Sequence, residues 1–187
     1  MNKLSKNLCI SNTAVILKTF RVNNISKKYI DNLNDFKINR YLEVRKTKQN
    51  KKTVTKYILN HINSTNKHMF QIRDKKRNKF IGTVTLDIKK KNYCYLGYMI
   101  SDYKYWGTKY SIIPFELIIK YIFQNLMIKN IICTTLVNNI GVVIFLKKFD
   151  FKKISNETSK NLYFKLFKKI KKNNINMNIL KNEKTKK

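Results

Sequence analysis

Cysteine is scarce in this 187-residue chain, and its placement argues against two classes of small protein. The three cysteines, Cys9, Cys94 and Cys133, are widely spaced, odd in number and outside any CxxC pair. This pattern argues against a disulfide scaffold and against a zinc site, and it favours a reducing compartment. Cys94 and Cys133 fall within strand-like runs, so we expect both to be buried structural thiols.

A long uninterrupted hydrophobic run is also absent. The longest apolar stretch, from Ile112 to Met127, is broken by Glu116, Lys120, Gln124 and Asn125, so we expect no transmembrane helix. The apolar patch near the N-terminus lacks a small-residue cleavage pattern, so we expect no export and a cytoplasmic location. With 43% apolar residues, the chain is typical of a globular protein that folds as one domain.

Acidic residues are few: 10 of them stand against 41 basic residues, which gives a net charge of +31. Taken alone, such a charge indicates a nucleic-acid or anionic-membrane partner. However, the lysines are spread along the chain with no nucleic-acid-binding motif around them, and AT-rich codons alone would supply many of them. We therefore favour a generic basic surface that steers anionic substrates, with a specific polyanion partner as the alternative.

The order of apolar and polar residues predicts an α+β chain. Period-two alternation from Phe80 to Ile88 predicts a half-buried strand. From Val54 to Ile62 the apolar positions have helical spacing, and His61 lies on that stripe, so we expect a packed core histidine. The basic segment 169–187 is expected to be a mobile tail, dispensable for folding. We expect strands over residues 13–20, 68–72, 79–88, 93–100, 130–137, 151–155 and 161–167, and helices over 26–33, 53–62, 111–127 and 139–148.

The helix predicted from Ser111 to Met127 is apolar nearly all round, so we expect it to be buried on most sides. Proline is tolerated in a helix only where its missing N–H would have no partner. We therefore expect Ser111 to be the N-cap and Pro114 to lie in the first turn.

The stretch from Leu96 to Phe151 carries the most specific pattern. An apolar strand runs into an aromatic–Gly turn and a long helix, and a second strand ends in Asn-Asn before a short helix that closes on Lys-Phe-Asp-Phe. A helix N-terminus at the end of an open strand suits a pyrophosphate, because its N–H groups and dipole attract anions. The stretch resembles the acyl-CoA-binding half of the Gcn5-related N-acetyltransferase (GNAT) superfamily. The most similar branch contains ribosomal-protein-alanine and amino-sugar acetyltransferases.

The resemblance implies a GNAT domain over residues 1–168, with a mixed, mostly antiparallel sheet flanked by helices. It also implies transfer of an acetyl group from acetyl-CoA to a primary amine, with no metal. In the family, a Gln/Arg-x-x-Gly-x-Gly/Ala turn presents N–H groups to the CoA pyrophosphate, often written Trp-Gly-Lys-Gly-Tyr-Ala in this branch. Residues 106–111 read WGTKYS. Lys109 thus replaces a glycine, where we expect crowding of the phosphate, partly offset by the charge of the ammonium.

Further positions follow from the same resemblance. The strand Leu96–Ser101 would offer backbone groups to the pantetheine arm. Asn139 would contact CoA or an ordered water near the thioester, and a helix N-cap is its alternative role. Many relatives protonate the leaving thiolate with a tyrosine on the following helix, where this chain has Phe145 and Leu146. The implied CoA-binding residues are Met99, Ile100, Ser101, Trp106, Gly107, Thr108, Lys109, Tyr110, Ser111, Asn139 and Lys148.

The segment 39–45, NRYLEVR, is similar to Tyr-Leu-Glu-x-Arg segments near the N-terminus of sugar-pathway members. The resemblance implies that Tyr41, Glu43 and Arg45 bind the acceptor, with Glu43 and Asn139 as catalytic residues. Glu43 would hold the amine or accept its proton, and Arg45 would bind a phosphate or carboxylate. A surface ion pair is the alternative for this segment, and His68 is a remoter candidate base.

We predict that the acceptor is the amine of a nucleotide-linked amino sugar. One alternative is a protein N-terminus, as for ribosomal-protein acetyltransferases. Another is a non-catalytic member that kept the fold for binding, which Lys109, Val142 and Asp150 favour as departures from the family pattern. A third is a basic RNA-associated protein. The sequence leaves open whether the protein is a monomer or a homodimer.

Overall fold

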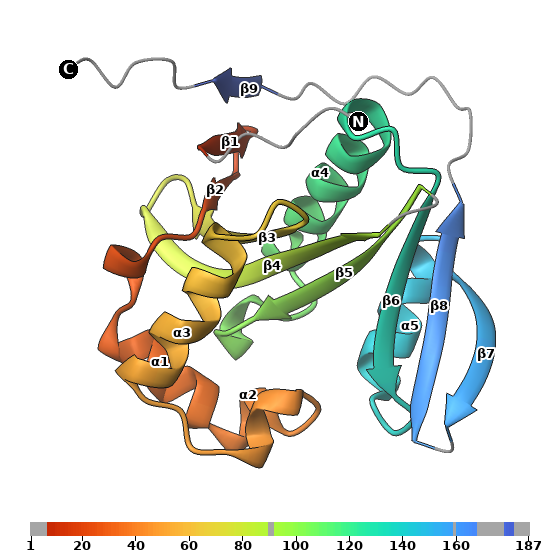
Figure 1. Cartoon of the computed structure of the whole chain (residues 1–187), viewed down its shortest axis with the longest axis horizontal. Helices are drawn as coiled ribbons and strands as arrows, with labels where there is room; N and C mark the ends of the chain where they lie inside the picture. Colours follow the sequence, from red (N-terminus) through yellow and green to blue (C-terminus); the bar gives the residue numbers. More distant parts are fainter. Residues whose placement is uncertain (1–6, 90–91, 159, 168–177, 182–187) are drawn as a thin grey trace.

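The computed structural model describes residues 7–89, 92–158, 160–167 and 178–181 (Figure 1). These residues form one sheet with the strand order β7-β8-β6-β5-β4-β3-β2-β1-β9. Neighbouring strands are antiparallel, except that β5 and β6 run parallel. The predicted α+β class, with a mixed and mostly antiparallel sheet, is confirmed.

The elements follow the predicted order, with one further strand at each end and one further short helix at Phe36–Asn39. The strands are β1 (Leu8–Ser11), β2 (Val15–Thr19), β3 (Lys67–Asp74), β4 (Lys79–Lys89), β5 (Tyr93–Ile100), β6 (Asn130–Leu136), β7 (Lys152–Thr158), β8 (Asn161–Phe167) and β9 (Asn178–Lys181). The α-helices are α1 (Lys27–Asn34), α2 (Phe36–Asn39), α3 (Lys51–Ile62), α4 (Lys109–Asn125) and α5 (Ile140–Lys148). Short 3-10 turns are η1 (Val22–Asn24), η2 (Glu43–Lys46) and η3 (Tyr103–Tyr105).

The C-terminal segment differs from the expected mobile tail. Asn178–Lys181 forms β9, which pairs antiparallel with β1 from Leu8 to Ser11. The prediction is therefore wrong for these four residues, and the remainder of 169–187 lies outside the described residues. Neither strand was predicted, because four residues are too few to show a period-two pattern.

Helix α4 begins one turn earlier than predicted. Thr108 is its N-cap, since its hydroxyl accepts a hydrogen bond from the N–H of Tyr110 at 3.2 Å. The hydroxyl of Ser111 instead donates to the Thr108 carbonyl at 2.8 Å from inside the helix. Pro114 lies in the second turn, where its missing N–H cannot donate to the carbonyl of Tyr110. The prediction of Ser111 as N-cap, with Pro114 in the first turn, is therefore wrong.

Two apolar clusters cover opposite faces of the sheet, because successive side chains of a strand point to opposite sides. On β3, Phe70 belongs to the larger cluster, which includes α4, and Met69 to the smaller one, which includes α1 and α3. On β5, Leu96 likewise belongs to the larger cluster and Met99 to the smaller one. Helices α3 and α4 accordingly lie on opposite sides of the sheet (Figure 1), and we call these sides the α3 face and the α4 face.

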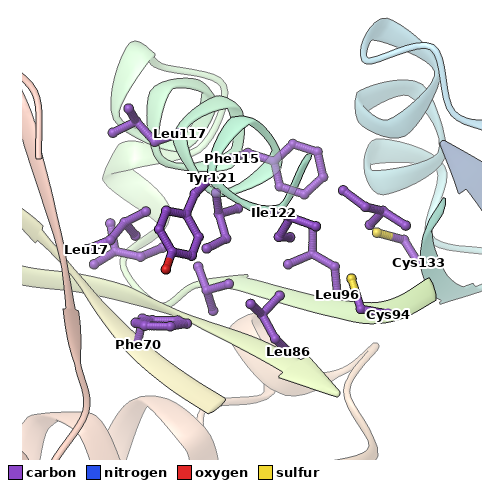
Figure 2. Packing of buried hydrophobic residues seen from close by; sticks show 14 of the residues in the cluster. Leu17, Phe70, Leu86, Cys94, Leu96, Phe115, Leu117, Tyr121, Ile122 and Cys133 are labelled. Carbon is purple, nitrogen blue, oxygen red and sulfur yellow. The ribbon is translucent and has the colours of Figure 1, made fainter. Parts of the chain in front are cut away.

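The α4 face holds the larger core, shown in Figure 2. Phe115 and Ile122 of α4 pack there with Leu96 of β5, and all three side chains are buried. Cys94 and Cys133 lie in the same cluster with 0% and 5% exposure, so the prediction of buried thiols is confirmed. Burial raises the pKa of the Cys94 thiol to about 12, which keeps it protonated and unreactive at neutral pH.

Candidate functional site

The two parallel strands separate after a short paired region. Strands β5 and β6 pair only at Tyr93–Asn130, Cys94–Ile131 and Tyr95–Ile132. Beyond these pairs β5 stays on β4 as far as Ile100, while β6 stays on β8 as far as Leu136. The strands therefore open as a V, visible in Figure 1, which leaves backbone edges along both arms.

The strand register shows which backbone groups of β5 face this V. The N–H of Ser101 donates to the carbonyl of Ile81, the residue of β4 opposite it, at 2.9 Å. Because hydrogen-bonding residues alternate along an antiparallel ladder, Met99 also turns its backbone groups to β4. Tyr98 and Ile100 turn theirs toward the V. Of the three predicted pantetheine contacts, the backbone groups of Ile100 thus face the V and those of Met99 and Ser101 do not, while Tyr98, which was not predicted, also faces it.

The turn after β5 is fixed to the end of that strand. The indole Nε1–H of Trp106 donates to the carbonyl of Ile100 at 2.9 Å. Gly107 has φ of 70°, a conformation that favours glycine, although the space around its Cα is open. The backbone N–H groups of Gly107 and Lys109 have no hydrogen-bond partner among the described residues. Free amides at the start of a long helix are suited to an anion, and here they adjoin the open end of the V.

Lys109 has an ordinary place in this arrangement. It is the first residue of α4, so its backbone is helical, and its ammonium Nζ lies 5.5 Å from the centre of the Tyr110 ring. The backbone conformation that favours glycine falls on Gly107 instead. A lysine therefore fits the first helical position without backbone strain, and it adds a positive charge beside the free amides.

A pocket of about 330 Å³ lies at the closed end of the V, on the α3 face. Its floor crosses four strands, and α3 forms one wall. Gly97 leaves this floor open, because a Cβ at that position would lie 2.4 Å from Oγ1 of Thr85. The lining residues are Tyr57, His61, Lys67, Thr85, Leu86, Asp87, Tyr95, Leu96, Gly97, Ile132 and Thr134.

The pocket contains both charges and an imidazole. Asp87 of β4 is directly opposite Lys67 of β3 in the strand register, and its carboxylate bonds the ammonium of Lys89 at 2.7 Å. His61 is half-buried in the wall, with its Nδ1 2.9 Å from the carbonyl oxygen of Tyr57. The prediction of a packed core histidine is therefore wrong. Helix α3 buries Val54 and Ile58 only, and His61 lies at the side of that apolar face.

Sequence reasoning missed most of this pocket, although two signals were present. Thr83, Thr85 and Asp87 alternate with apolar residues along β4, which marks one polar side of that strand. Gly97 interrupts a strand, where glycine often allows the close approach of another group. The pocket itself required the arrangement of five elements that are distant in sequence.

The residues predicted on α5 are separated by the length of that helix. Asn139 is at the N-cap position, but its side chain makes no capping hydrogen bond, so the half-buried amide stays available to a ligand. Lys148 is the last residue of α5, about 13 Å further along the axis. Phe145 packs on the rings of Tyr98 and Phe115, with centroids 6.1 and 4.9 Å away.

The predicted acceptor segment lies outside the pocket. The side chain of Glu43 is 72% exposed and pairs with Lys46, which lowers the pKa of the Glu43 carboxyl. Arg45 donates from Nη1 to a backbone carbonyl at 2.7 Å, and the ring of Tyr41 lies beneath Arg40. The surface ion pair is therefore the arrangement found for Glu43, because a 3-10 turn places residues three apart on one side.

The remaining candidates are placed as follows. His68 is opposite Leu86 in the strand register, so it faces α4 and not the pocket. Within the described residues there is no group of His, Cys, Asp and Glu that is suited to hold a metal ion. Nor does that part of the chain contain a helix with the length and hydropathy needed to cross a membrane.

The fold is similar to that of solved acetyltransferases. Spermidine N-acetyltransferase from Vibrio cholerae, solved with CoA and spermine, has a TM-score of 0.71 at 15% identity, over 83% of this chain and 96% of that one. A GNAT-family acetyltransferase from Bacillus anthracis gives 0.69 at 14% identity, over 85% and 98%. RimL, a ribosomal L7/L12 α-N-protein acetyltransferase in complex with CoA, gives 0.70 at 11% identity, over 83% and 95%.

No curated protein sequence matches the chain. The family model of the acetyltransferase (GNAT) domain, however, matches residues 15–152, which is most of the chain and includes both arms of the V and the turn before α4. The chain therefore belongs to the GNAT acetyltransferase family and is an acetyl-CoA-dependent N-acetyltransferase.

Proposed function

We propose that this protein transfers the acetyl group of acetyl-CoA to the primary amine of a nucleotide-linked amino sugar. The observation that carries the proposal is the continuous path from the free amides of Gly107 and Lys109, along the open edge of β5, to the pocket at the closed end of the V. The pyrophosphate would lie on the amides, and the pantetheine would bond the backbone of Tyr98. The thioester would then lie next to the pocket.

Four other residues that were predicted to contact CoA have different places in this arrangement. Thr108 and Ser111 hold the first turn of α4 through their hydroxyl hydrogen bonds, so they position the amides. The free side-chain amide of Asn139 would reach CoA from the other arm of the V, beyond the end of β6. Lys148 is at the far end of α5, so it and Asn139 cannot contact the same group of CoA.

The charges around the pocket favour an acceptor that carries phosphate. Asp87 is the carboxylate in its lining; the ammonium of Lys89 pairs with it, and Lys67 lines the same pocket from the position opposite Asp87 in the sheet. A polyamine would bring further positive charge into this site, whereas a sugar nucleotide brings one amine and a negative diphosphate. The volume of about 330 Å³ suits a small ligand such as one sugar ring. The diphosphate would remain outside, where the net charge of +31 attracts it.

Release of CoA from acetyl-CoA tests the proposal directly. We expect turnover with UDP-linked amino sugars and none with spermidine or with short N-terminal peptides. Turnover confined to peptides would overturn the choice of acceptor and favour a protein N-terminus. Turnover confined to spermidine would favour a polyamine.

Binding of CoA, followed by thermal shift, tests the donor site separately, because a ligand of the folded state raises the midpoint. We expect Lys109→Ala to weaken CoA binding by about two- to fivefold at low salt, and less at high salt, since an exposed charge pair contributes only about 0.3–1 kcal/mol. Lys56→Ala, on the exposed side of α3, is the matched control. A wild-type protein that binds no CoA would contradict the donor site.

A further inference from the structure

We propose that His61 is the base that takes the proton from the acceptor amine, an inference that rests on the proposed transfer to an amine in this pocket. His61 lines the pocket from α3, at the closed end of the V where the thioester would lie. An ammonium group cannot attack a thioester, so its proton must first be removed, and a base placed in this pocket accelerates that step.

The position of the ring fixes its tautomer. A backbone carbonyl only accepts hydrogen bonds, so the contact of 2.9 Å between Nδ1 and the carbonyl oxygen of Tyr57 places the proton on Nδ1. The lone pair is then on Nε2, at the opposite side of the ring. The Tyr57 ring also packs against the imidazole, with centroids 4.5 Å apart, which limits rotation of His61. The helix therefore holds this imidazole ready to accept a proton.

The other groups around His61 are less suited to this task. The carboxylate of Asp87 already accepts a hydrogen bond from Lys89, and Asp87 lies opposite Lys67 in the strand register. Burial raises the pKa of the Tyr57 phenol, so this group stays protonated at neutral pH.

Two further titratable side chains, Tyr95 and His68, lie near His61 in the structure or in the sequence. Tyr95 lies across the floor on β5. His68 on β3 is near His61 in sequence but points to the α4 face. Among these groups, His61 is the imidazole that lines the pocket.

The transfer can be written with all protons assigned. Nε2 of His61 takes one proton from the acceptor ammonium, and the imidazolium later releases it to water. The neutral amine attacks the thioester carbonyl carbon, so that a C–N bond forms and a tetrahedral intermediate results. When the intermediate collapses, the C–S bond breaks, and the second proton of the nitrogen passes to the leaving sulfur. This route uses no tyrosine on α5, in agreement with Phe145 and Leu146 at that helix.

The chain has two histidines, so two single variants assign the imidazole. With a UDP-linked amino sugar as acceptor, we expect His61→Gln to lower kcat/KM by about 100-fold or more at neutral pH. The loss should shrink as the pH rises, because free amine then forms without a base. His68→Gln, the matched control, should keep the wild-type acidic limb of the pH–rate profile. The thermal shift with CoA should be the same in all three proteins.

A second variant separates chemistry from folding. We expect added imidazole to restore activity to His61→Ala, which a merely structural role would not allow. A His61→Gln protein that keeps both its rate and its acidic limb would overturn the assignment. A wild-type protein that binds CoA but acetylates no amine would overturn the proposed function, and the base with it.

Discussion

The two faces of the sheet are built for different tasks. On the α4 face, a helix that is apolar nearly all round packs on the sheet, and the resulting cluster contains residues of β1 to β6 and of β8. On the α3 face, α3 buries only Val54 and Ile58, and the smaller cluster there includes Met69 of β3, with Phe80 of β4 and Met99 of β5 packed against it. The part of this face left uncovered, above β4, β5 and β6, is the pocket. Stability is thus concentrated on one face, and acceptor recognition on the other.

The proposed sites for acetyl-CoA and for the acceptor are also divided between the two faces of the sheet. Residues that shape the proposed donor site also belong to the α4 side: the hydroxyl of Tyr98 donates to the carbonyl of Ser111 at 2.7 Å, and its ring packs on Phe115. Residues of the proposed acceptor site are polar side chains on the α3 side, and few of them are buried. Acceptor preference can therefore change on the α3 face with little effect on the core.

The largest expected effect comes from matched isoleucines on the two faces. Ile118 of α4 and Ile58 of α3 are both fully buried, at 0% exposure. Truncation to alanine costs about 2–5 kcal/mol of unfolding free energy, depending on how far the surroundings collapse into the cavity. We expect Ile118→Ala near the upper end, because helix and sheet enclose the residue. We expect Ile58→Ala near the lower end, because the smaller cluster beside the pocket can relax.

Urea unfolding with unchanged m-values measures both losses. Equal losses would show that the two faces are equally rigid, and a larger loss for Ile58→Ala would reverse the comparison.

The next effect concerns the acceptor alone. A Cβ at Gly97 would approach Oγ1 of Thr85 to 2.4 Å, so Gly97→Ala forces the threonine into the pocket or the strand outward. Moving crowded atoms in this way costs about 1–3 kcal/mol. We expect a loss of the same size in acceptor binding, which would raise the acceptor KM by about 5- to 150-fold. We expect no change in the affinity for CoA.

The double variant Gly97→Ala/Thr85→Ala removes the clash, and we expect it to recover most of the acceptor affinity. Thr85→Ala alone is its control. A Gly97→Ala protein with weakened CoA binding and an unchanged acceptor KM would place the acceptor elsewhere.

The difference between the faces also explains what the sequence could predict. The strand 93–100 and the helix of α3 carry clear apolar periods, and their predicted bounds agree with the structure to within about two residues. The turn at Gly107 was located by resemblance. His61 was misassigned, because a histidine on an apolar stripe has the same spacing whether it packs in a core or borders a pocket. The choice between Tyr98 and Met99 depends on the strand register, which periodicity does not specify.

The smallest expected effect is a pH dependence of stability that belongs to the α4 face. Burial lowers the pKa of His68, and its Nε2 is buried without a hydrogen-bond partner among the described residues. The folded state thus favours the neutral ring, whereas in the unfolded chain the ring titrates near its ordinary value of about 6.5. The unfolded state then binds more protons below that value, so this contribution to stability is complete above about pH 6.5. It is lost as the pH falls through the folded-state pKa.

Melting temperatures measured between pH 7.5 and 5 check this prediction. We expect the wild-type midpoint to fall over this range and His68→Gln to fall less, because glutamine has no proton to gain. His61→Gln removes a charge that also lowers the pKa of His68, but burial is the larger cause, so we expect this variant to keep most of the wild-type slope. If His61→Gln flattens the pH dependence of the melting temperature and His68→Gln does not, the acid sensitivity comes from the pocket wall. The core of the α4 face is then not its source.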